Sequence, residues 1–280
     1  MTATDDRWDG ERATRWIRQA EGLERQLAPV SDVLFDRAGL AHGERVLDVG
    51  CGTGTTTRQA ARLVVPDGVV TGIDVAQEMI AAAEAGAQGA APIDWIVADV
   101  TTWDPGDHRF DVVISRFGVM FFDDPAAAFA NLATATVIGG RMHLAVWAER
   151  QHSELFEVPL QAGLAELHRR GVARDLPPAN SGPFSLGDEP AVRRSLETTG
   201  WDDVEWQPHE LSFLVGGGMT PAEAAEALLE LGPIRVVTAE LDEPTKAAVG
   251  EAIRDRLELH VDAGQVVLGG RVIAVSARRV

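Results

Sequence analysis

Apolar runs and amphipathic segments alternate along the chain between Glu44 and Ala148. The apolar runs predict five buried strands, which cover residues 44–50, 68–75, 93–100, 110–117 and 139–148. The amphipathic segments predict helices at residues 55–64, 76–86 and 124–135. Because parallel strands need crossovers of about this kind, the pattern predicts an α/β fold with a doubly wound, Rossmann-like sheet. A ligand is expected beyond the carboxyl ends of its strands.

The alternation stops after Glu149. A helix is predicted at 156–171, followed by a loop rich in proline, glycine and asparagine. The remaining predicted elements are a helix at 189–200, a strand at 203–215, helices around 222–231 and 243–259, and a strand or hairpin at 265–279. The predicted parts of the chain are an N-terminal helical lid (1–40), a ligand-binding core (41–150), a cap insertion (151–190) and a C-terminal part of the core with inserted helices (191–280).

Composition and charge exclude several classes of protein. The chain has 280 residues, of which 45% are hydrophobic, so it can bury a large core. A formal net charge of −18 opposes binding to nucleic acids, and no apolar run reaches the roughly 18 residues of a membrane span. The acidic start lacks the basic region of a signal peptide, so a cytoplasmic protein is expected. The single cysteine, Cys51, cannot form an internal disulfide.

Three glycines at alternate positions follow the first predicted strand, in the stretch RVLDVGCGTGTTT from Arg45 to Thr57. In a dinucleotide-binding fingerprint the third glycine comes three positions after the second, whereas here it comes two positions after. No lysine follows, so the stretch is not a P-loop either. Asp48, just inside the strand end, would repel a phosphate and attract an ammonium group. These features favour a cofactor with an amino acid moiety over one with a diphosphate.

Acidic residues also close the next two predicted strands. Asp74 is placed to bind a ribose diol, and Asp99 to accept a hydrogen bond from an exocyclic amine such as that of adenine. One acidic residue at a strand end is more often a turn residue or a helix cap. Three of them at one edge of the sheet, next to a glycine turn, indicate a nucleoside cofactor.

The segments VLDVGCGTG, GIDVAQEMI, ADV and FDVVISRFGVMFFDDP resemble the class I S-adenosylmethionine-dependent methyltransferases, particularly the type that acts on small molecules. The resemblance covers roughly Glu44 to Trp147 and is weaker elsewhere. It implies a seven-stranded, mostly parallel sheet with an antiparallel last strand. It also implies that S-adenosylmethionine is the cofactor and that a methyl group is transferred by in-line displacement.

The resemblance also implies roles for individual residues. The three glycines would line the cofactor, Asp48 would serve its amino group and Asp74 its ribose hydroxyls. Met79 would pack near the adenine, and Asp99 with Val100 would read the adenine edge. Ser115 and Arg116 would approach the methionine end. The complete predicted cofactor site consists of Asp48, Gly50, Cys51, Gly52, Thr53, Gly54, Asp74, Val75, Met79, Asp99, Val100, Ser115 and Arg116.

The chain departs from its relatives in two places. Relatives often carry a tyrosine in the N-terminal lid, in a pattern like W-x-x-x-A-x-x-Y, but this chain has Trp16, Ala20 and then Glu24 near that position. The segment after the fourth predicted strand also lacks the Asn/Asp-Pro-Pro-aromatic motif that enzymes methylating nucleobases or glutamine amides tend to carry. The second departure agrees with the negative charge of the chain.

Methyl transfer from a sulfonium requires an acceptor that is close, aligned and shielded from water. The segment Phe117–Phe122 would form an apolar wall, with the loop around Phe184 and the helix bearing Phe156 closing over it. At least half of these side chains are expected to face the core instead. The predicted substrate residues are Trp16, Phe117, Met120, Phe121, Phe156 and Phe184.

Candidate bases and metal ligands are few. His152, just after the fifth predicted strand, is the candidate catalytic base for a hydroxyl or ammonium acceptor, although such a residue is more often an exposed loop histidine. His143 lies inside that strand and is predicted to be a core or sheet-face histidine whose ring nitrogens are hydrogen-bonded. Asp123 and Asp124 suggest a metal site, but Asp124 before Pro125 is better explained as a helix cap. No metal is predicted.

Three functions therefore stay open. The leading one is methyl transfer to a small, fairly apolar metabolite through oxygen, nitrogen or carbon, as in natural-product biosynthesis, by a cytoplasmic protein that forms a monomer or a homodimer. The second is a protein that keeps the fold and the cofactor without methyl transfer, such as a cyclase or a regulatory protein. The third, an NAD-dependent oxidoreductase, is disfavoured by the glycine spacing and by the absence of tyrosine, which excludes a Tyr-x-x-x-Lys pair.

Overall fold

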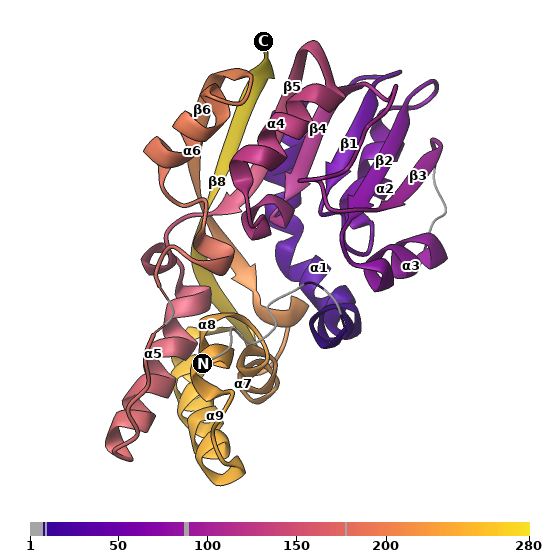
Figure 1. Cartoon of the computed structure of the whole chain (residues 1–280). Coiled ribbons are helices and arrows are strands. Elements are labelled where there is room, and N and C mark those ends of the chain that lie inside the picture. The colour runs from indigo at the N-terminus through magenta and orange to yellow at the C-terminus, as the bar shows by residue number, and fades with distance from the viewer. Residues whose placement is uncertain (1–7, 9, 87–89, 177) are drawn as a thin grey trace.

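A mostly parallel sheet forms the centre of the protein, and a computed structural model describes residues 8, 10–86, 90–176 and 178–280 (Figure 1). The strands follow the order β3-β2-β1-β4-β5-β8-β6, and the short β7 pairs only with β8. Strands β1 to β5 pair in parallel, whereas β8 is antiparallel to both β5 and β6. Their bounds are β1 (Arg45–Val49), β2 (Val69–Asp74), β3 (Ile93–Val97), β4 (Phe110–Arg116), β5 (Thr136–Trp147), β6 (Trp201–Leu214), β7 (Val261–Asp262) and β8 (Gln265–Arg279). The predicted α/β class and the antiparallel last strand are confirmed.

Helices cover the sheet, and the longest of them is α1 (Glu11–Ala38). The others that accompany the sheet are α2 (Thr55–Leu63), α3 (Gln77–Gly86), α4 (Pro125–Ala135) and α6 (Glu189–Glu197). The carboxyl half of α1 contacts β4, β5, β6 and β8, and it contributes Val30 and Leu34 to the core at 0% and 1% exposure. Burial of these apolar side chains holds α1 on the sheet. The predicted N-terminal helical segment is thus one continuous helix whose second half belongs to the core.

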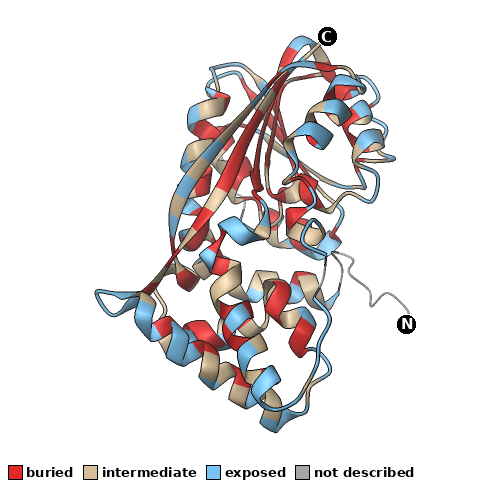
Figure 2. Cartoon of the chain, turned by 90° about the vertical axis from the view of Figure 1, so that its left-hand side faces the viewer, coloured by how far each residue is buried: buried red, intermediate tan, exposed pale blue. Residues whose placement is uncertain are grey.

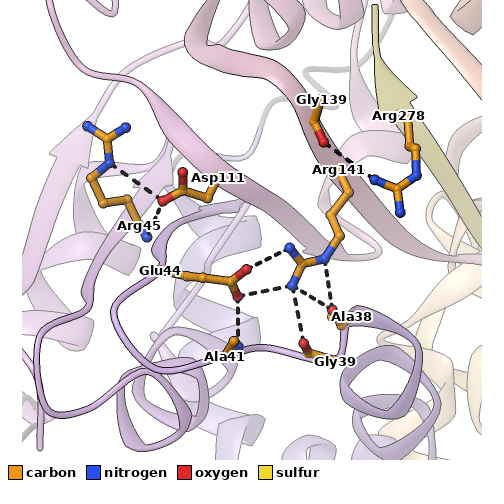
Figure 3. A network of polar contacts seen from close by, with 9 residues as sticks. All are labelled: Ala38, Gly39, Ala41, Glu44, Arg45, Asp111, Gly139, Arg141 and Arg278. Atoms are coloured by element: carbon orange, nitrogen blue, oxygen red, sulfur yellow. Dashed lines mark hydrogen bonds and ion pairs between the residues drawn. The ribbon is translucent and has the colours of Figure 1, made fainter.

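A network of polar contacts fixes the carboxyl end of α1 (Figure 3). The guanidinium of Arg141 donates to the carbonyls of Ala38 and Gly39, at 3.0 and 3.2 Å, and pairs with Glu44 at 2.7 Å. The N–H groups of the guanidinium satisfy the last carbonyls of the helix, and its positive charge interacts favourably with the negative end of the helix dipole. Gly39 ends the helix in the left-handed conformation, with φ of +50°. The first strand β1 therefore begins at a position set by α1 and β5.

A second group of helices lies beyond one end of the sheet, where β6 and β8 extend past the other strands (Figures 1 and 2). It consists of α5 (Glu154–Arg169), α7 (Pro221–Leu229), α8 (Gly232–Thr238) and α9 (Glu243–Leu257). Helix α5 packs on α8 and α9, and a Cβ on Gly163 of α5 would lie 2.6 Å from Ile234 of α8. Buried residues line the inner faces of these helices (Figure 2). Short 3₁₀ helices connect the two groups at η2 (Arg150–His152), η3 (Gly182–Phe184) and η4 (Val215–Gly217). Two others, η1 (Gly118–Phe121) and η5 (Glu258–His260), follow β4 and precede β7, respectively.

Two details of the fold differ from the sequence prediction. Strand β3 ends at Val97 instead of Asp99, because Asp99 turns the chain and its Oδ1 accepts a hydrogen bond from the Thr101 N–H at 2.8 Å. Helix α8 was not predicted as a separate element. The predicted cap of α4 is confirmed, since Oδ1 of Asp124 accepts from the Ala127 N–H at 3.0 Å. Within the described part of the chain, no helix is both long and apolar enough to cross a membrane.

Candidate active site

The three glycines after β1 all have left-handed backbones but face different surroundings. Their φ angles are +65° at Gly50, +55° at Gly52 and +80° at Gly54. A Cβ on Gly50 would lie 2.5 Å from the Cα of Gly118, and one on Gly54 would lie 2.4 Å from the ring of Trp95, whereas one on Gly52 would meet nothing within 4 Å. The outer glycines therefore permit close packing inside the protein. Only the middle one borders open space, where a ligand can approach the backbone.

Two side chains that the sequence analysis did not identify support this loop. Arg58 of α2 donates to the carbonyl of Thr53 at 2.8 Å and to that of Ala83 in α3 at 3.3 Å, so it joins the loop to the next helix. Trp95 of β3 fills the space left by Gly54, and its ring would also lie 2.6 Å from a Cβ on Gly72. No spacing of residues in the sequence predicts these contacts, because each of them joins separate elements.

Asp48 is a buried carboxylate with one oxygen in use. Its Oδ2 accepts hydrogen bonds from the hydroxyls of Thr56 and Thr57, at 2.7 and 2.6 Å, and its Oδ1 is buried without a partner among the described residues. Burial raises the pKa of Asp48 to about 6, although the two threonines and the positive charge of Arg116 oppose the shift. The threonine cluster after the glycines thus holds this carboxylate. Its free oxygen suits the ammonium group expected of the ligand.

Asp74, at the end of β2, holds the middle glycine in place. Its Oδ2 accepts from the N–H of Gly52 and its Oδ1 from the N–H of Ala76, both at 2.9 Å. Burial raises the pKa of Asp74, and the backbone hydrogen bonds reduce the shift. Each carboxylate oxygen can accept a further hydrogen bond. Asp74 can therefore bind a diol while it orients the glycine loop.

Of the four residues predicted beside the adenine, two are exposed and two are buried. Val75 is 53% exposed, while Met79 is 1% exposed and packs with Ala13 and Trp16 of α1. Asp99 is exposed, and the predicted Val100 beside it is buried, with its carbonyl accepting from Asn131 at 2.7 Å. The first turns of α1 therefore cover the predicted adenine side of the site.

The end of β4 carries an unusual backbone conformation. Ser115 is fully buried and donates to the carbonyl of Val49 at 2.7 Å, so its hydroxyl joins β4 to β1. Arg116 follows, and its guanidinium contacts α1. Phe117 then adopts φ of +70°, which is rare for a bulky residue and tends to occur at functional sites. The close contact of Gly118 with Gly50 brings this turn beside the glycine loop.

The predicted substrate residues form two aromatic groups. In the first, Phe117 stacks on Trp147 at 4.7 Å between ring centroids, Trp147 meets Phe156 edge-on at 5.1 Å, and Phe156 meets Phe184 at 5.0 Å. Met120 is buried beside them and accepts from the Trp147 N–H at 3.4 Å through its sulfur. Trp147, the last residue of β5, connects this group, and the sequence analysis missed it.

The second aromatic group lies where α1 begins. Trp8 contacts Phe121 at 5.0 Å and Trp16 at 5.6 Å between ring centroids. The guanidinium of Arg12 lies 4.1 Å from the ring of Trp8 and 4.8 Å from that of Phe121. Trp16 belongs to the group around Met79 as well, so this aromatic group connects the adenine side with the predicted acceptor side.

His143 and His152, the two histidines considered in the sequence analysis, lie outside the two aromatic groups. His152 is in η2, with its side chain 38% exposed and its Nε2 3.6 Å from a carboxylate oxygen of Glu149. It lines a pocket of about 310 Å³ with Trp206 and Arg271, and no predicted cofactor residue lines that pocket. His143 is buried in the sheet as predicted, but neither ring nitrogen has the expected hydrogen-bond partner among the described residues. Burial lowers its pKa to about 4. Within the described ranges, no group of three or more histidine, cysteine, aspartate or glutamate side chains is arranged to hold a metal ion.

Comparison with known proteins identifies the family. Residues 46–140 match a family profile described as a methyltransferase domain. The fold matches that of Haemonchus contortus phosphoethanolamine N-methyltransferase 2, solved with S-adenosylhomocysteine, with a TM-score of 0.53 and 18% identity over 96% of this chain and 57% of that one. Nocamycin O-methyltransferase of Saccharothrix syringae is 30% identical over 276 residues, which is 94% of each chain. The chain belongs to the S-adenosylmethionine-dependent methyltransferases. The family that the sequence motifs indicated is thereby confirmed.

Other methyltransferases match over shorter stretches. Aklanonic acid methyltransferase DauC of Streptomyces sp. (strain C5) is 38% identical over 116 residues, which is 41% of this chain and 53% of DauC. The match thus spans about half the length of this relative. The geometry of the site fits the family's cofactor, S-adenosylmethionine, because the free oxygen of Asp48 suits an ammonium group and the open space at Gly52 permits a close approach to the backbone.

Proposed function

We propose that this methyltransferase family member transfers the methyl group of S-adenosylmethionine to a small, fairly apolar metabolite. The observation that carries the proposal is the contact between Gly50 and Gly118, since the glycine loop thereby lies next to the turn at Phe117 and its aromatic neighbours. A polar cradle and an apolar wall therefore share one end of the sheet. Such a pair suits a reaction between a charged nucleoside cofactor and an apolar acceptor.

The residues of the chain have separable tasks in this reaction. When bound, S-adenosylmethionine supplies an electrophilic methyl group on a sulfonium. Gly52 admits the ligand to the backbone, Asp74 holds the ribose hydroxyls and Asp48 the ammonium group. The aromatic groups around Phe117 and Phe121 exclude water and align the acceptor with the methyl group. Catalysis then rests mainly on orientation and desolvation.

Oxygen is the acceptor atom that we favour among oxygen, nitrogen and carbon. Nocamycin O-methyltransferase, which matches along 94% of its length, is named for an oxygen acceptor, and DauC is named for an acid. Both relatives are named for particular compounds, nocamycin and aklanonic acid, which supports a role in natural-product biosynthesis. A cytoplasmic location and a homodimer stay predictions from the sequence.

The structure gives little support to His152 as the base. Its side chain is partly exposed beside Glu149, and it shares a pocket with Trp206 and Arg271 rather than with the glycine loop. A carboxylic acid or an acidic phenol ionises without a protein base, so this acceptor class fits the site. His152→Gln should then leave kcat/KM within about twofold, and a loss of about a hundredfold would restore His152 as the base.

A methyl-transfer assay tests the proposed function. The protein is incubated with S-adenosylmethionine carrying a ¹³C-methyl group and with aromatic carboxylic acids and phenols, and products are detected by mass spectrometry. Labelled methyl product should form together with S-adenosylhomocysteine. If calorimetry shows tight binding of S-adenosylmethionine while neither these acceptors nor a host extract become labelled, a cofactor-binding protein without methyl transfer is the better assignment. Binding of NAD instead would contradict both.

A further inference from the structure

A mostly buried ion pair joins α1 to the end of β4. Nη2 of Arg116 donates to both carboxylate oxygens of Glu24, at 2.7 and 2.6 Å, and Nη1 donates to Oγ of Ser31 at 2.7 Å. The side chains of Arg116 and Glu24 are 9% and 20% exposed. Three short hydrogen bonds from one helix thus fix the position of this guanidinium.

The segment of α1 that carries Glu24 is itself held firmly. A Cβ on Gly22 would lie 2.6 Å from the carbonyl oxygen of Gly216, so helix and η4 are in backbone contact there. Oε1 of Gln26 accepts from the N–H of Gly216 at 2.7 Å. Glu24 lies between these two contacts. Glu24 therefore lies in a part of α1 that is packed against η4. The first turns of α1 instead contact Phe121 and Met79.

The ion pair leaves hydrogen-bonding groups free next to Asp48. Among the described residues, Arg116 uses Nη1 once and Nη2 for Glu24, so its Nε–H and one Nη1 hydrogen have no protein acceptor. Oδ1 of Asp48 has no donor among the described residues, and Asp48 pairs across β1 and β4 with Ile114, two residues before Arg116. Free donors and a free acceptor in one place match the carboxylate and the ammonium of an amino acid.

We propose that Glu24 is a positioning residue for the amino acid moiety of the cofactor. It holds Arg116 where the guanidinium can bind the cofactor's carboxylate while Asp48 binds its ammonium group. This inference rests on the proposed function, because it takes S-adenosylmethionine as the ligand. It adds a residue from α1 whose task is to orient another side chain rather than to contact the reacting atoms.

The physical reason for a glutamate lies in the attraction between Arg116 and Asp48. Without Glu24, a guanidinium that is 9% exposed would need another carboxylate, and Asp48, on the strand next to Arg116, has a buried oxygen without a partner among the described residues. A direct pair between them would consume both groups that the ligand needs. Glu24 and Ser31, both in α1, supply competing acceptors for the guanidinium. Arg116 and Asp48 are thereby kept apart and available.

Two nucleoside ligands distinguish a role in binding the amino acid moiety from a general role in holding α1 in place. S-adenosylhomocysteine carries the amino acid moiety, and 5′-methylthioadenosine has the same nucleoside and sulfur without it. Glu24→Gln should weaken S-adenosylhomocysteine about 10–100-fold in calorimetry, because hydrogen bonds to charged groups are lost, and leave 5′-methylthioadenosine within about twofold. Glu21→Gln is the matched control, since Glu21 lies one turn earlier with its side chain 90% exposed, and both ligands should bind it as they bind the wild type.

A second pair of variants tests the route of action. Ser31→Ala removes the other hydrogen bond to Arg116 and should weaken S-adenosylhomocysteine by about 3–10-fold with the same selectivity, so it serves if Glu24→Gln folds poorly. In an Arg116→Lys background, Glu24→Gln should add less than about twofold, since both changes act through one group.

Several results would overturn the inference. Equal losses for both ligands in Glu24→Gln would show that Glu24 only holds α1 in place, and unchanged binding of both would show that it has no role in the site. Additive effects of Glu24→Gln and Arg116→Lys would exclude action through Arg116. If the wild type binds neither ligand, the proposed function itself fails, which differs from every result that concerns Glu24 alone.

Discussion

The cofactor side of the site and its aromatic side are built in different ways. On the cofactor side, Asp48, the threonines that bind it and the glycine loop come from one continuous stretch, and Asp74 follows soon after. On the aromatic side, Phe117, Trp147, Phe156 and Phe184 come from four separate elements. One side consists of specific polar contacts, and the other consists of packed rings.

This difference reflects the chemistry of the two ligands. A cofactor with an ammonium group and a ribose diol needs donors and acceptors at fixed positions, and a short motif can supply them. An apolar acceptor needs a pocket that fits its shape and excludes water, and many combinations of aromatic residues can form one. The aromatic residues also serve the core, since Phe117 and Phe184 are 7% and 3% exposed. Substitutions should therefore separate the two sides by what they affect.

The largest expected effect is on the cofactor side, at Gly52. Gly52→Val should abolish binding of S-adenosylhomocysteine in calorimetry, because the new side chain would enter the open space over the loop. The matched control is Gly106→Val, at a glycine with φ of +53° and nothing within 4 Å of its Cβ position. Both variants should lose about 1–2 kcal/mol of unfolding free energy through the left-handed backbone. Normal binding by Gly52→Val would contradict the proposed place of the cofactor.

Asp74 should show the next largest effect. Asp74→Ala should weaken cofactor binding by roughly 2–4 kcal/mol through the loss of two charge-assisted hydrogen bonds to the ribose. It also leaves the N–H groups of Gly52 and Ala76 without acceptors, so the unfolding free energy of the ligand-free protein should fall by about 1–3 kcal/mol. Calorimetry and urea unfolding measure the two effects. Destabilisation with unchanged affinity in the folded fraction would make Asp74 a structural residue only.

Asp48 should make the cofactor side sensitive to pH. Its pKa is raised to about 6 in the folded protein, so the unfolded chain loses this proton first as the pH rises. The unfolding free energy should be highest below about pH 4, fall by about 3 kcal/mol at most up to pH 6, and stay level above it, apart from the contributions of other groups. Asp48→Asn should remove that slope. A wild-type protein whose stability rises from pH 4 to 6 as steeply as that of the variant would contradict the raised pKa.

Cofactor affinity should change with pH in the opposite sense. An ionised Asp48 binds the ammonium group, so S-adenosylhomocysteine should bind about tenfold more weakly at pH 5 than at pH 7.5. Calorimetry at the two pH values checks this prediction. The same weakening in Asp48→Asn would assign the effect to another group.

The aromatic side should give the smallest effect on binding. Phe121→Ala should raise KM or lower kcat for the acceptor by about 3–30-fold, while cofactor affinity stays within a few-fold, because Phe121 contacts Trp8 and Arg12 beside the proposed acceptor space. Phe122→Ala is the control, since Phe122 packs on Phe129 of the core at 6.3 Å between centroids. It should lower stability without changing KM. A loss of cofactor affinity in Phe121→Ala alone would move Phe121 to the cofactor side.

Much of the cofactor side could be predicted from the sequence. The alternation of strands and helices, the glycine turn and the acidic residues at strand ends identified the sheet, the family and the residues around the loop. The aromatic wall was predicted only in part. Phe117 and Phe156 were predicted, but Trp147, which contacts both of them, was taken only as part of a strand. The threonines that bind Asp48 were visible as a cluster, yet their partner was not.

The sequence by itself determined the features whose contacts are local. The cap of α4 by Asp124 spans three residues, so the order of residues fixes it. Only the tertiary structure decided which glycine faces open space, because Gly118 and Trp95 come from other elements, η1 and β3. The same holds for Glu24 and Arg116, which are 92 residues apart and pair because α1 crosses the sheet at the end of β4. Packing of distant elements brings such groups together, and no local pattern records it.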